Sequence, residues 1–293
     1  MRYFVFIVML FVVMGCRQEP TLTFVFVGDL MPDRGIRKVI EQKGIDALFE
    51  RLPYNLNTVD YTVANLECAV CDTTLNKENK RYTFRANPEW LQGFRRNGIN
   101  IVSLANNHSG DYGENGFLQT LYHVRKSAMY AVGGSAQKSL SGAPLIVFRG
   151  KIRVALFSSD LLKSDNHYMY HASVAALKKR VNTFKAGNPD TQIIVLLHWG
   201  VEGKLKPESK QIQEAHSLID AGADVLIGTH PHVVQPMEQY KKGLIFYSLG
   251  NFVFDNRHTP ENTGMMVRLK IGAEGITAMD TTTYKVYTGY GSR

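Results

Sequence analysis

The stretch Val225-Leu226-Ile227-Gly228-Thr229-His230-Pro231-His232 joins an apolar run directly to two imidazoles. A short run of β-branched and aliphatic residues predicts a strand that is buried on both faces, as in a parallel sheet. His230 and His232 lie two positions apart on either side of a proline, and this arrangement favours a metal site. We therefore expect the chemistry of the protein to lie in the turn after this strand.

Five further apolar runs lead to a polar residue in the same way. These residues are Asp29 after 24–28, Asn65 and Glu67 after 61–64, Asn106-Asn107-His108 after 101–105, His198 after 193–197 and Asn251 after 246–250. In open α/β sheets, ligands bind beyond the carboxyl ends of the strands. If these strands are parallel, their polar residues meet in one patch.

Each of these residues also has a purely structural explanation. Asp29 could cap a turn, Glu67 could pair with an arginine, and His198 could be a hydrogen-bonded core histidine. Asn106 and Asn107 are residues that turns favour. Their joint occurrence at strand ends favours a metal site, because imidazole, carboxylate and amide oxygens are ligands for zinc, manganese and iron.

Strand patterns alternate with amphipathic helical patterns along most of the chain, which predicts an α/β fold. Helices are expected over 35–52, 88–97, 116–127, 174–186 and 206–221, and strands over 22–27, 61–64, 99–104, 145–147, 154–158, 193–197, 225–228 and 244–249. The stretches 265–271 and 276–288 lack a helical pattern and are expected to be paired strands. One domain over residues 22–293 accounts for these elements.

The N-terminus has the pattern of a targeting segment. Arg2 precedes an apolar run over residues 3–15 that has the length of a signal-peptide core, and the run ends in Gly15-Cys16. A small residue before cysteine resembles a lipobox, so we expect a lipoprotein signal peptide over 1–16, lipidation of Cys16 and a short tether over 17–21. A plain signal peptide and a short membrane anchor are the alternatives.

The other two cysteines form Cys68-Ala69-Val70-Cys71. A single pair of this kind is weak evidence for zinc, because a structural zinc site usually needs a second pair. We expect a local disulfide or two unreactive thiols in an oxidising compartment.

Composition and charge fit a globular protein that meets anionic partners. Of 293 residues, 44% are hydrophobic, and 34 Lys and Arg against 26 Asp and Glu give a formal charge of +8. The basic residues are scattered, and no aromatic-plus-basic repeat indicates a nucleic-acid binder. A modest attraction to anionic substrates, polymers or headgroups is consistent with this charge.

Several longer motifs resemble the CapA family, which is named for capsule and poly-γ-glutamate biosynthesis and is similar to a branch of the calcineurin-like metallophosphoesterases. The matching stretches are Val27-Gly28-Asp29-Leu30-Met31, Ala64-Asn65-Leu66-Glu67, Ser103-Leu104-Ala105-Asn106-Asn107-His108 with Asp111-Tyr112-Gly113, His198-Trp199-Gly200-Val201-Glu202, Gly228 through Pro236, and Tyr247-Ser248-Leu249-Gly250-Asn251-Phe252. The resemblance covers about residues 22–270. It implies a four-layer α-β-β-α sandwich of two mixed sheets with helices outside.

The resemblance also implies roles for individual residues. The implied ligands of a divalent metal, such as Mn, Zn or Fe, are Asp29, Glu67, Asn107, His198, His230 and His232. The resemblance implies that His108, beside Asn107, contacts the substrate or acts as an acid catalyst. The residues that it implies in supporting or substrate-side positions are Arg34, Asn65, Glu202 and Asn251. One departure stands out. The superfamily has Asp-x-His in its first motif, whereas this chain has Asp29-Leu30-Met31. Thioether sulfur is a poor ligand for hard metals.

Two functions follow from these features. The first is a metal-dependent hydrolase at the cell envelope that acts on a phosphoester or an amide-linked polymer. The second is a non-catalytic, lipid-anchored accessory that binds an anionic polymer, or a membrane synthase or export complex. The missing histidine, the anchor and the positive charge motivate the second.

Overall fold

Two β-sheets stack face to face in a computed structural model that describes residues 20–162, 170–256 and 258–286. The first sheet has the order β15 (Gly275–Lys285), β14 (Thr263–Gly272), β1 (Leu22–Leu30), β2 (Tyr61–Leu66), β5 (Ile101–Ser103) and β6 (Tyr130–Val132), with β13 (Asn251–Val253) also paired to β1. The second has the order β11 (Met237–Tyr240), β12 (Gly243–Phe246), β10 (Val225–Thr229), β9 (Gln192–His198), β8 (Ile152–Asp160) and β7 (Leu145–Arg149). A small ladder joins β3 (Ala69–Val70) to β4 (Arg85–Ala86).

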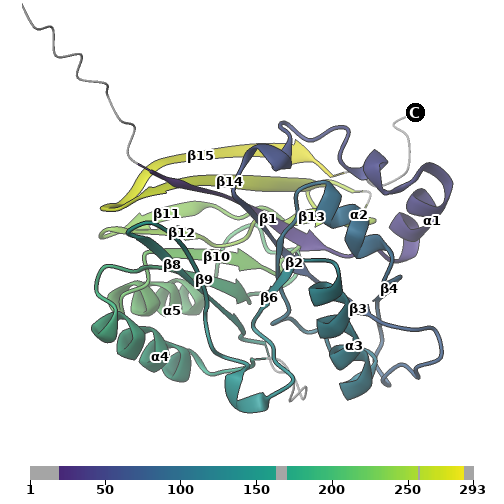
Figure 1. Ribbon diagram of the computed structural model, residues 1–293, viewed down its shortest axis with the longest axis horizontal. Helices are drawn as coiled ribbons and strands as arrows, with labels where there is room; N and C mark the ends of the chain where they lie inside the picture. The colour runs from purple at the N-terminus through teal and green to yellow at the C-terminus, as the bar shows by residue number, and fades with distance from the viewer. Residues whose placement is uncertain (1–19, 163–169, 257, 287–293) are drawn as a thin grey trace, which may run out of the picture.

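Helices cover the outer faces of both sheets (Figure 1). The first sheet is covered by α1 (Arg34–Lys43), α2 (Trp90–Arg96) and α3 (Gly113–Lys126), and the second by α4 (Val174–Gly187) and α5 (Ser209–Asp220). Three short 3₁₀ helices, η1 (Ile45–Leu48), η2 (Leu56–Thr58) and η3 (Lys138–Leu140), lie in the connections. The expected four-layer α-β-β-α sandwich is therefore confirmed.

The unbroken apolar runs of the sequence are explained by this layering. In β1, Phe24 and Phe26 pack between the two sheets, while Val25 and Val27 face the helices. The side chains of β9 alternate in the same way: Ile194 packs between the two sheets, and the residues on either side of it pack against α4 and α5. Because both faces of each central strand are buried, both faces are apolar.

The central strands of both sheets deliver their carboxyl ends to one edge of the sandwich. Strands β1, β2, β5 and β6 are mutually parallel, and so are β8, β9, β10 and β12. Asp29 is the Cα partner of both Asn65 and Asn251, and Thr229 is the partner of His198. We call this edge the site end, and the opposite edge, where Leu22, Ile152 and Gln192 begin their strands, the basal end.

Some predicted boundaries were wrong. The helix expected over 35–52 ends at Lys43, because Gly44 adopts φ 79° and its N–H caps the Ile40 carbonyl. The helix expected from 206 begins at Ser209. The expected pair of C-terminal strands is the β14–β15 hairpin, and residues 287 and 288 of that prediction lie outside the described residues.

The predicted signal peptide over 1–16, including Cys16, and residues 17–19 of the tether also lie outside the described residues. In the part of the chain that is described, no helix is long and apolar enough to cross a membrane. Cys68 and Cys71 are free thiols there, and both are buried. Burial raises the pKa of both, that of Cys71 to about 11, which fits the unreactive-thiol alternative.

Candidate metal centre

Carboxylates and imidazoles from both sheets meet at the site end. Asp29 comes from β1, Glu67 follows β2, His198 ends β9, and His230 and His232 follow β10. Three overlapping groups have ligand atoms within 4.8 Å of one another. Glu67, His198 and His230 form one, Asp29, Glu67 and His232 form another, and the exposed Glu202 forms a third with His230 and His232. Of the two groups that are mostly buried, both contain Glu67, so its carboxylate is placed to bridge two ion positions.

Glu67 lies at the centre of the cluster. Its side chain is fully buried, and neither carboxylate oxygen has a hydrogen-bond partner among the described residues. Its Oε1 lies 3.7 Å from Nε2 of His198 and 3.7 Å from Nε2 of His232. Burial, with the nearby Asp29 carboxylate, raises the pKa of Glu67 well above its ordinary value. A buried, unpaired carboxylate is costly unless a cation compensates it.

The ring of His198 is held through one nitrogen and offers the other. Nδ1 lies 3.1 Å from the Thr229 hydroxyl and 3.2 Å from Nδ2 of Asn65. Nε2 lies 3.0 Å from Oδ1 of Asn107 and faces Glu67. Burial and the neighbouring histidines His230 and His232 lower the pKa of His198 well below its ordinary value, so the ring is neutral near pH 7 and can act as a ligand.

The loop after β10 has a strained backbone. His230 and His232 adopt φ angles of 96° and 58°, in a region that residues other than glycine rarely use. The loop is held by Asp29, whose Oδ2 accepts the His230 N–H at 3.3 Å and lies 3.2 Å from Nδ1 of His232. Nδ1 of His230 is buried without a hydrogen-bond partner within the described residues.

The pKa values of the two histidines of this loop are shifted in opposite directions. Burial, with His232 nearby, lowers the pKa of His230 to about 4, so this ring is neutral near pH 7. Burial also lowers the pKa of His232, but hydrogen bonds to Asp29 and Asn251 outweigh it and raise that pKa above its ordinary value. Protons therefore compete for His232 more strongly than for His230.

The arrangement of these side chains fits a divalent metal ion. Two nitrogen or oxygen ligands about 2.1 Å from one ion lie roughly 3–3.5 Å apart. The Nε2 atom of His198 is 3.0 Å from Asn107 Oδ1, and Glu67 Oε1 is 3.7 Å from two imidazoles. Ion pairs of Glu67 and Asp29 within the described residues involve histidines, so neither carboxylate is neutralised by lysine or arginine. The unpaired atoms of Glu67 and His230 are those that an ion would satisfy.

His108 lies beside these groups and has different partners. Its Nδ1 is 2.7 Å from Oδ2 of Asp111, a wholly buried carboxylate. The other Asp111 oxygen accepts a bond from Lys80 Nζ at 2.7 Å, and the Phe84 N–H donates to Oδ2 at 2.7 Å. The Phe84 ring packs on the imidazole at 4.3 Å between centroids. His108 is thus oriented by a carboxylate and has its second nitrogen free for a proton transfer.

The four residues assigned to supporting positions lie around the cluster. Asn65 donates to Asp29 Oδ1 at 2.8 Å, and Asn251 Oδ1 lies 3.0 Å from Nδ1 of His232. Glu202 is exposed, and its carboxylate lies within 4.8 Å of the ligand atoms of His230 and His232. Arg34 is half-exposed, pairs with Asp255 at 3.2 Å and has φ 54°.

The roles of two buried polar residues were not predicted from the sequence. Asn106 is buried, donates to Asn65 and to the Leu66 carbonyl, and accepts the His108 N–H at 3.0 Å, so it ties two strand-end loops together. Asp160 ends β8, is buried, and has one oxygen without a partner among the described residues; burial raises its pKa to about 7. Strand-end placement could have flagged Asp160.

Met31 stands where the superfamily has a histidine. It is fully buried in the core between the first sheet and its helices. The third residue of that motif therefore contributes to core packing in this chain, and the other candidate ligands lie at other strand ends.

Comparisons with known proteins show the family of the chain and its fold. The family model of the bacterial capsule synthesis protein PGA_cap matches residues 23–256. The chain is 30% identical over 288 residues to the capsule biosynthesis protein CapA of Bacillus anthracis, which covers 93% of this chain and 69% of that protein. It is 30% identical over 283 residues to the PGA biosynthesis protein CapA of Bacillus subtilis (strain 168), with 92% and 73% covered.

More distant proteins are similar as well. A probable polyglutamine synthesis accessory protein of Mycobacterium tuberculosis (strain CDC 1551 / Oshkosh) is 24% identical over 215 residues, with 67% of this chain and 56% of that protein covered. Among solved structures, a phosphatase of Mycoplasma pneumoniae aligns with a TM-score of 0.56 at 12% identity over 92% of this chain and 95% of that one. The NAD nucleotidase of Haemophilus influenzae aligns with a TM-score of 0.51, also at 12% identity, over 91% of this chain and 50% of that one.

The two structural likenesses show that the fold is shared with a phosphatase and an NAD nucleotidase, and at this identity they show the fold alone. The match to the family model covers most of the chain, and the resemblance to CapA proteins is confirmed. The chain belongs to the bacterial capsule synthesis protein PGA_cap family.

Proposed function

We propose that this protein is a metal-dependent hydrolase of the bacterial cell envelope that acts during the synthesis or export of an anionic capsule polymer such as poly-γ-glutamate. The chemistry is supported above all by Glu67, a fully buried carboxylate that faces His198 and His232 and has no hydrogen-bond partner within the described residues. The biological setting is supported by the 30% identity to two proteins named for capsule and PGA biosynthesis.

The residues that would hold the metal are Asp29, Glu67, Asn107, His198, His230 and His232, with Glu202 within reach. A bound divalent ion supplies a Lewis acid, which polarises the scissile group and lowers the pKa of a coordinated water. Asn65, Thr229 and Asn251 orient the ligand side chains. Such outer partners keep the geometry fixed while charge develops in the reaction.

His108 is placed to serve as the acid. When a water oxygen bonds to the phosphorus or carbonyl carbon, the bond to the leaving group breaks, and the leaving oxygen or nitrogen needs a proton. Nε2 of a protonated His108 supplies this proton, while Nδ1 donates to Asp111. Asp111 is itself held by Lys80 and the Phe84 N–H, so the ring cannot turn away. Arg34 at the rim supplies a cation for an anionic part of the substrate.

Cys16 supplies the attachment to the membrane in this proposal, through a lipid on the first residue after the signal peptide. The support is the sequence pattern alone: an apolar run over 3–15 that ends in Gly15-Cys16. A lipid-anchored hydrolase would meet the polymer where it leaves the membrane.

A non-catalytic accessory role is the second candidate, and Met31 favours it. A buried methionine replaces a ligand of the superfamily, so one ion position has fewer protein donors. A relative in Mycobacterium tuberculosis carries the name of an accessory protein. In this case, polyanion binding would survive chelation of metal, and no variant at the metal ligands would change polymer export.

The hydrolase proposal is tested by metal content and turnover in the same preparations. We expect the wild-type protein with Mn²⁺ or Zn²⁺ to cleave model phosphoesters or γ-glutamyl polymers. His230→Ala should lose both the bound metal and most of the activity. His123→Ala, a change of the same type on the half-buried surface of α3, should lose neither. Equal metal content and activity in the His230 variant would refute the proposal.

A further inference from the structure

The folded chain begins at the end of the sandwich that lies opposite the metal centre. Leu22 is fully buried at the start of β1 and pairs with Ile271 of β14. Just before it, the Thr21 carbonyl accepts a hydrogen bond from Arg149 of β7 at 2.8 Å. Just after it, the Thr23 N–H donates to Asp60 at 2.7 Å. The point where the tether leaves the domain is therefore fixed on the basal end.

The length of the tether limits how far the basal end can lie from a membrane. Four residues lie between Cys16 and Thr21, so five Cα–Cα steps join the two. A fully extended chain of that length spans at most about 18 Å. If Cys16 carries a lipid, the basal end stays within this distance of the bilayer surface.

A large aromatic side chain projects from the same end. Phe148 is 71% exposed, the highest value among the exposed large hydrophobic side chains of the described residues, and it directly precedes Arg149, which holds Thr21. Ile146 is 41% exposed on the same face of edge strand β7, whereas Val147 between them packs inside the sandwich. When a protein lies on a bilayer, apolar side chains such as Phe on the contacting face become buried at the boundary between headgroups and acyl chains.

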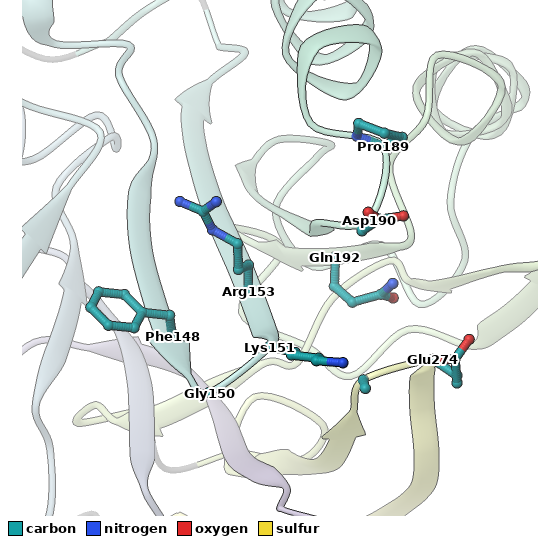
Figure 2. Close-up of a pocket in the computed structure, with 9 residues that line it drawn as sticks. Phe148, Gly150, Lys151, Arg153, Pro189, Asp190, Gln192 and Glu274 are labelled. Atoms are coloured by element: carbon teal, nitrogen blue, oxygen red, sulfur yellow. The ribbon is translucent and has the colours of Figure 1, made fainter.

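The surroundings of Phe148 are nearly neutral. Figure 2 shows a pocket of about 830 Å³ that Phe148 borders, with Lys151 and Arg153 on one side and Asp190 and Glu274 on the other. Positive and negative side chains balance there, so charge does not select an anionic surface. The attraction to a bilayer would come from the aromatic ring and the tether, and it should persist with neutral lipids and at high salt.

We propose that the basal end, with Phe148 at its surface, rests on the lipid bilayer and directs the metal centre away from the membrane. The inference depends on the lipid anchor of the proposed function. Strand β1 runs from Leu22 at the basal end to Asp29 at the metal centre (Figure 1). Seven residues of strand cover about 23 Å. With β1 upright on the bilayer, the centre would lie about that far above the level at which β1 begins.

This orientation selects a class of substrate. A polymer that extends from the membrane, or a molecule free above it, can reach the centre. A bond at the level of the lipid headgroups, as in a lipid-linked precursor, cannot. The substrate class expected from the orientation is thus the distal part of an anionic chain rather than a lipid headgroup.

The test uses the full chain, lipid-modified and reconstituted into vesicles of phosphatidylcholine, with or without phosphatidylglycerol. A thiol-reactive fluorophore is placed at Phe148→Cys or, as the matched control at the site end, at the 56% exposed Leu205→Cys. The native Cys68 and Cys71 are buried and stay unlabelled. Headgroup-level spin-labelled lipids should quench most of the fluorescence at position 148 and leave position 205 unchanged, in both lipid mixtures.

A second pair of variants tests whether the Phe148 ring itself contributes to the contact with the bilayer. With the label at Lys151→Cys, adding Phe148→Ser should reduce the quenching, whereas adding Leu205→Ser should not. Metal-dependent activity on a soluble substrate should stay unchanged in each, which shows that the domain is folded. Equal quenching at 148 and 205 in vesicle-bound protein would overturn the orientation while leaving the anchor intact. Protein that does not sediment with vesicles would overturn both the anchor and the orientation, without bearing on the metal centre.

Discussion

Replacing Glu67 by glutamine should stabilise the metal-free protein while abolishing most of its response to metal. The change keeps the shape of the side chain and removes a charge that is buried without a hydrogen-bond partner in the described structure. An unsatisfied buried group costs about 1–3 kcal/mol, and more when it is charged. The amide of glutamine would also lack hydrogen-bond partners at this position, so we take the low end of this range as the gain in stability. We expect a gain of about 1 kcal/mol, or about 2–4 °C in Tm.

The metal-bound protein should respond in the opposite direction. At a metal concentration of about 100 times Kd, binding stabilises the wild-type fold by about 2.7 kcal/mol. This raises Tm by about 5–11 °C. If glutamine weakens binding about 100-fold, the same concentration stabilises the variant by only about 0.4 kcal/mol, a rise of about 1–2 °C. Metal should therefore reverse the order of stability of the two proteins.

The assay is thermal unfolding with a chelator and with Mn²⁺ or Zn²⁺, and Glu50→Gln, a change at an exposed glutamate, is the control.

The pH dependence of stability gives a further check on the metal-free samples. The pKa of Glu67 lies well above its ordinary value of 4.5, so the wild-type protein loses stability as the pH rises through this raised pKa. The advantage of the variant should vanish as the pH falls towards 4.5. A metal-free variant less stable than the wild type, or an equal response of both to metal, would refute the reasoning.

The remaining predictions concern the acid, the protonation of a ligand and the anchor. Asp111→Asn should lower kcat about 100-fold with the metal content unchanged, because Asp111 orients His108; esters with a good leaving group should lose less. Metal affinity, measured by calorimetry, should increase as the pH rises through the raised pKa of His232, and His232→Ala should weaken this dependence to the part that Glu67 contributes. Cys16→Ala should move the protein from the membrane to the soluble fraction, and an unchanged fractionation would reject lipidation.

The sequence allowed the positions of the site residues to be predicted because the fold obeys one rule of parallel sheets. Buried strands read as apolar runs, and the first polar residue after such a run lies at the carboxyl edge. Asp29, His198 and His230 could be located in this way without knowing the order of the strands. Once β1 and β9 lie in facing sheets, their ends must meet, since the two sheets share one core.

Contacts within loops could not be predicted in the same way. Asn106 joins two strand ends through its side chain, and Lys80 reaches Asp111 from a loop that has no periodic pattern. The end of α1 was missed for a related reason. The apolar spacing continues past Gly44, but its φ of 79° ends the α-helix, and the next turn forms a 3₁₀ helix. The spacing of apolar residues indicates which face of an element is buried, whereas the backbone conformation determines where the element ends.

The departure at Met31 makes the two ion positions unequal. Glu67 belongs to both of the mostly buried groups of donors, so the difference lies in the other members. One group adds His198 and His230, both kept neutral by burial. The other adds Asp29 and His232, whose pKa is raised, and it has no histidine at position 31 to compensate. Apart from the shared Glu67, protons therefore compete with metal more strongly at the second position than at the first. The sequence difference from the wider superfamily thus weakens one position selectively and leaves the bridging carboxylate and the other position intact.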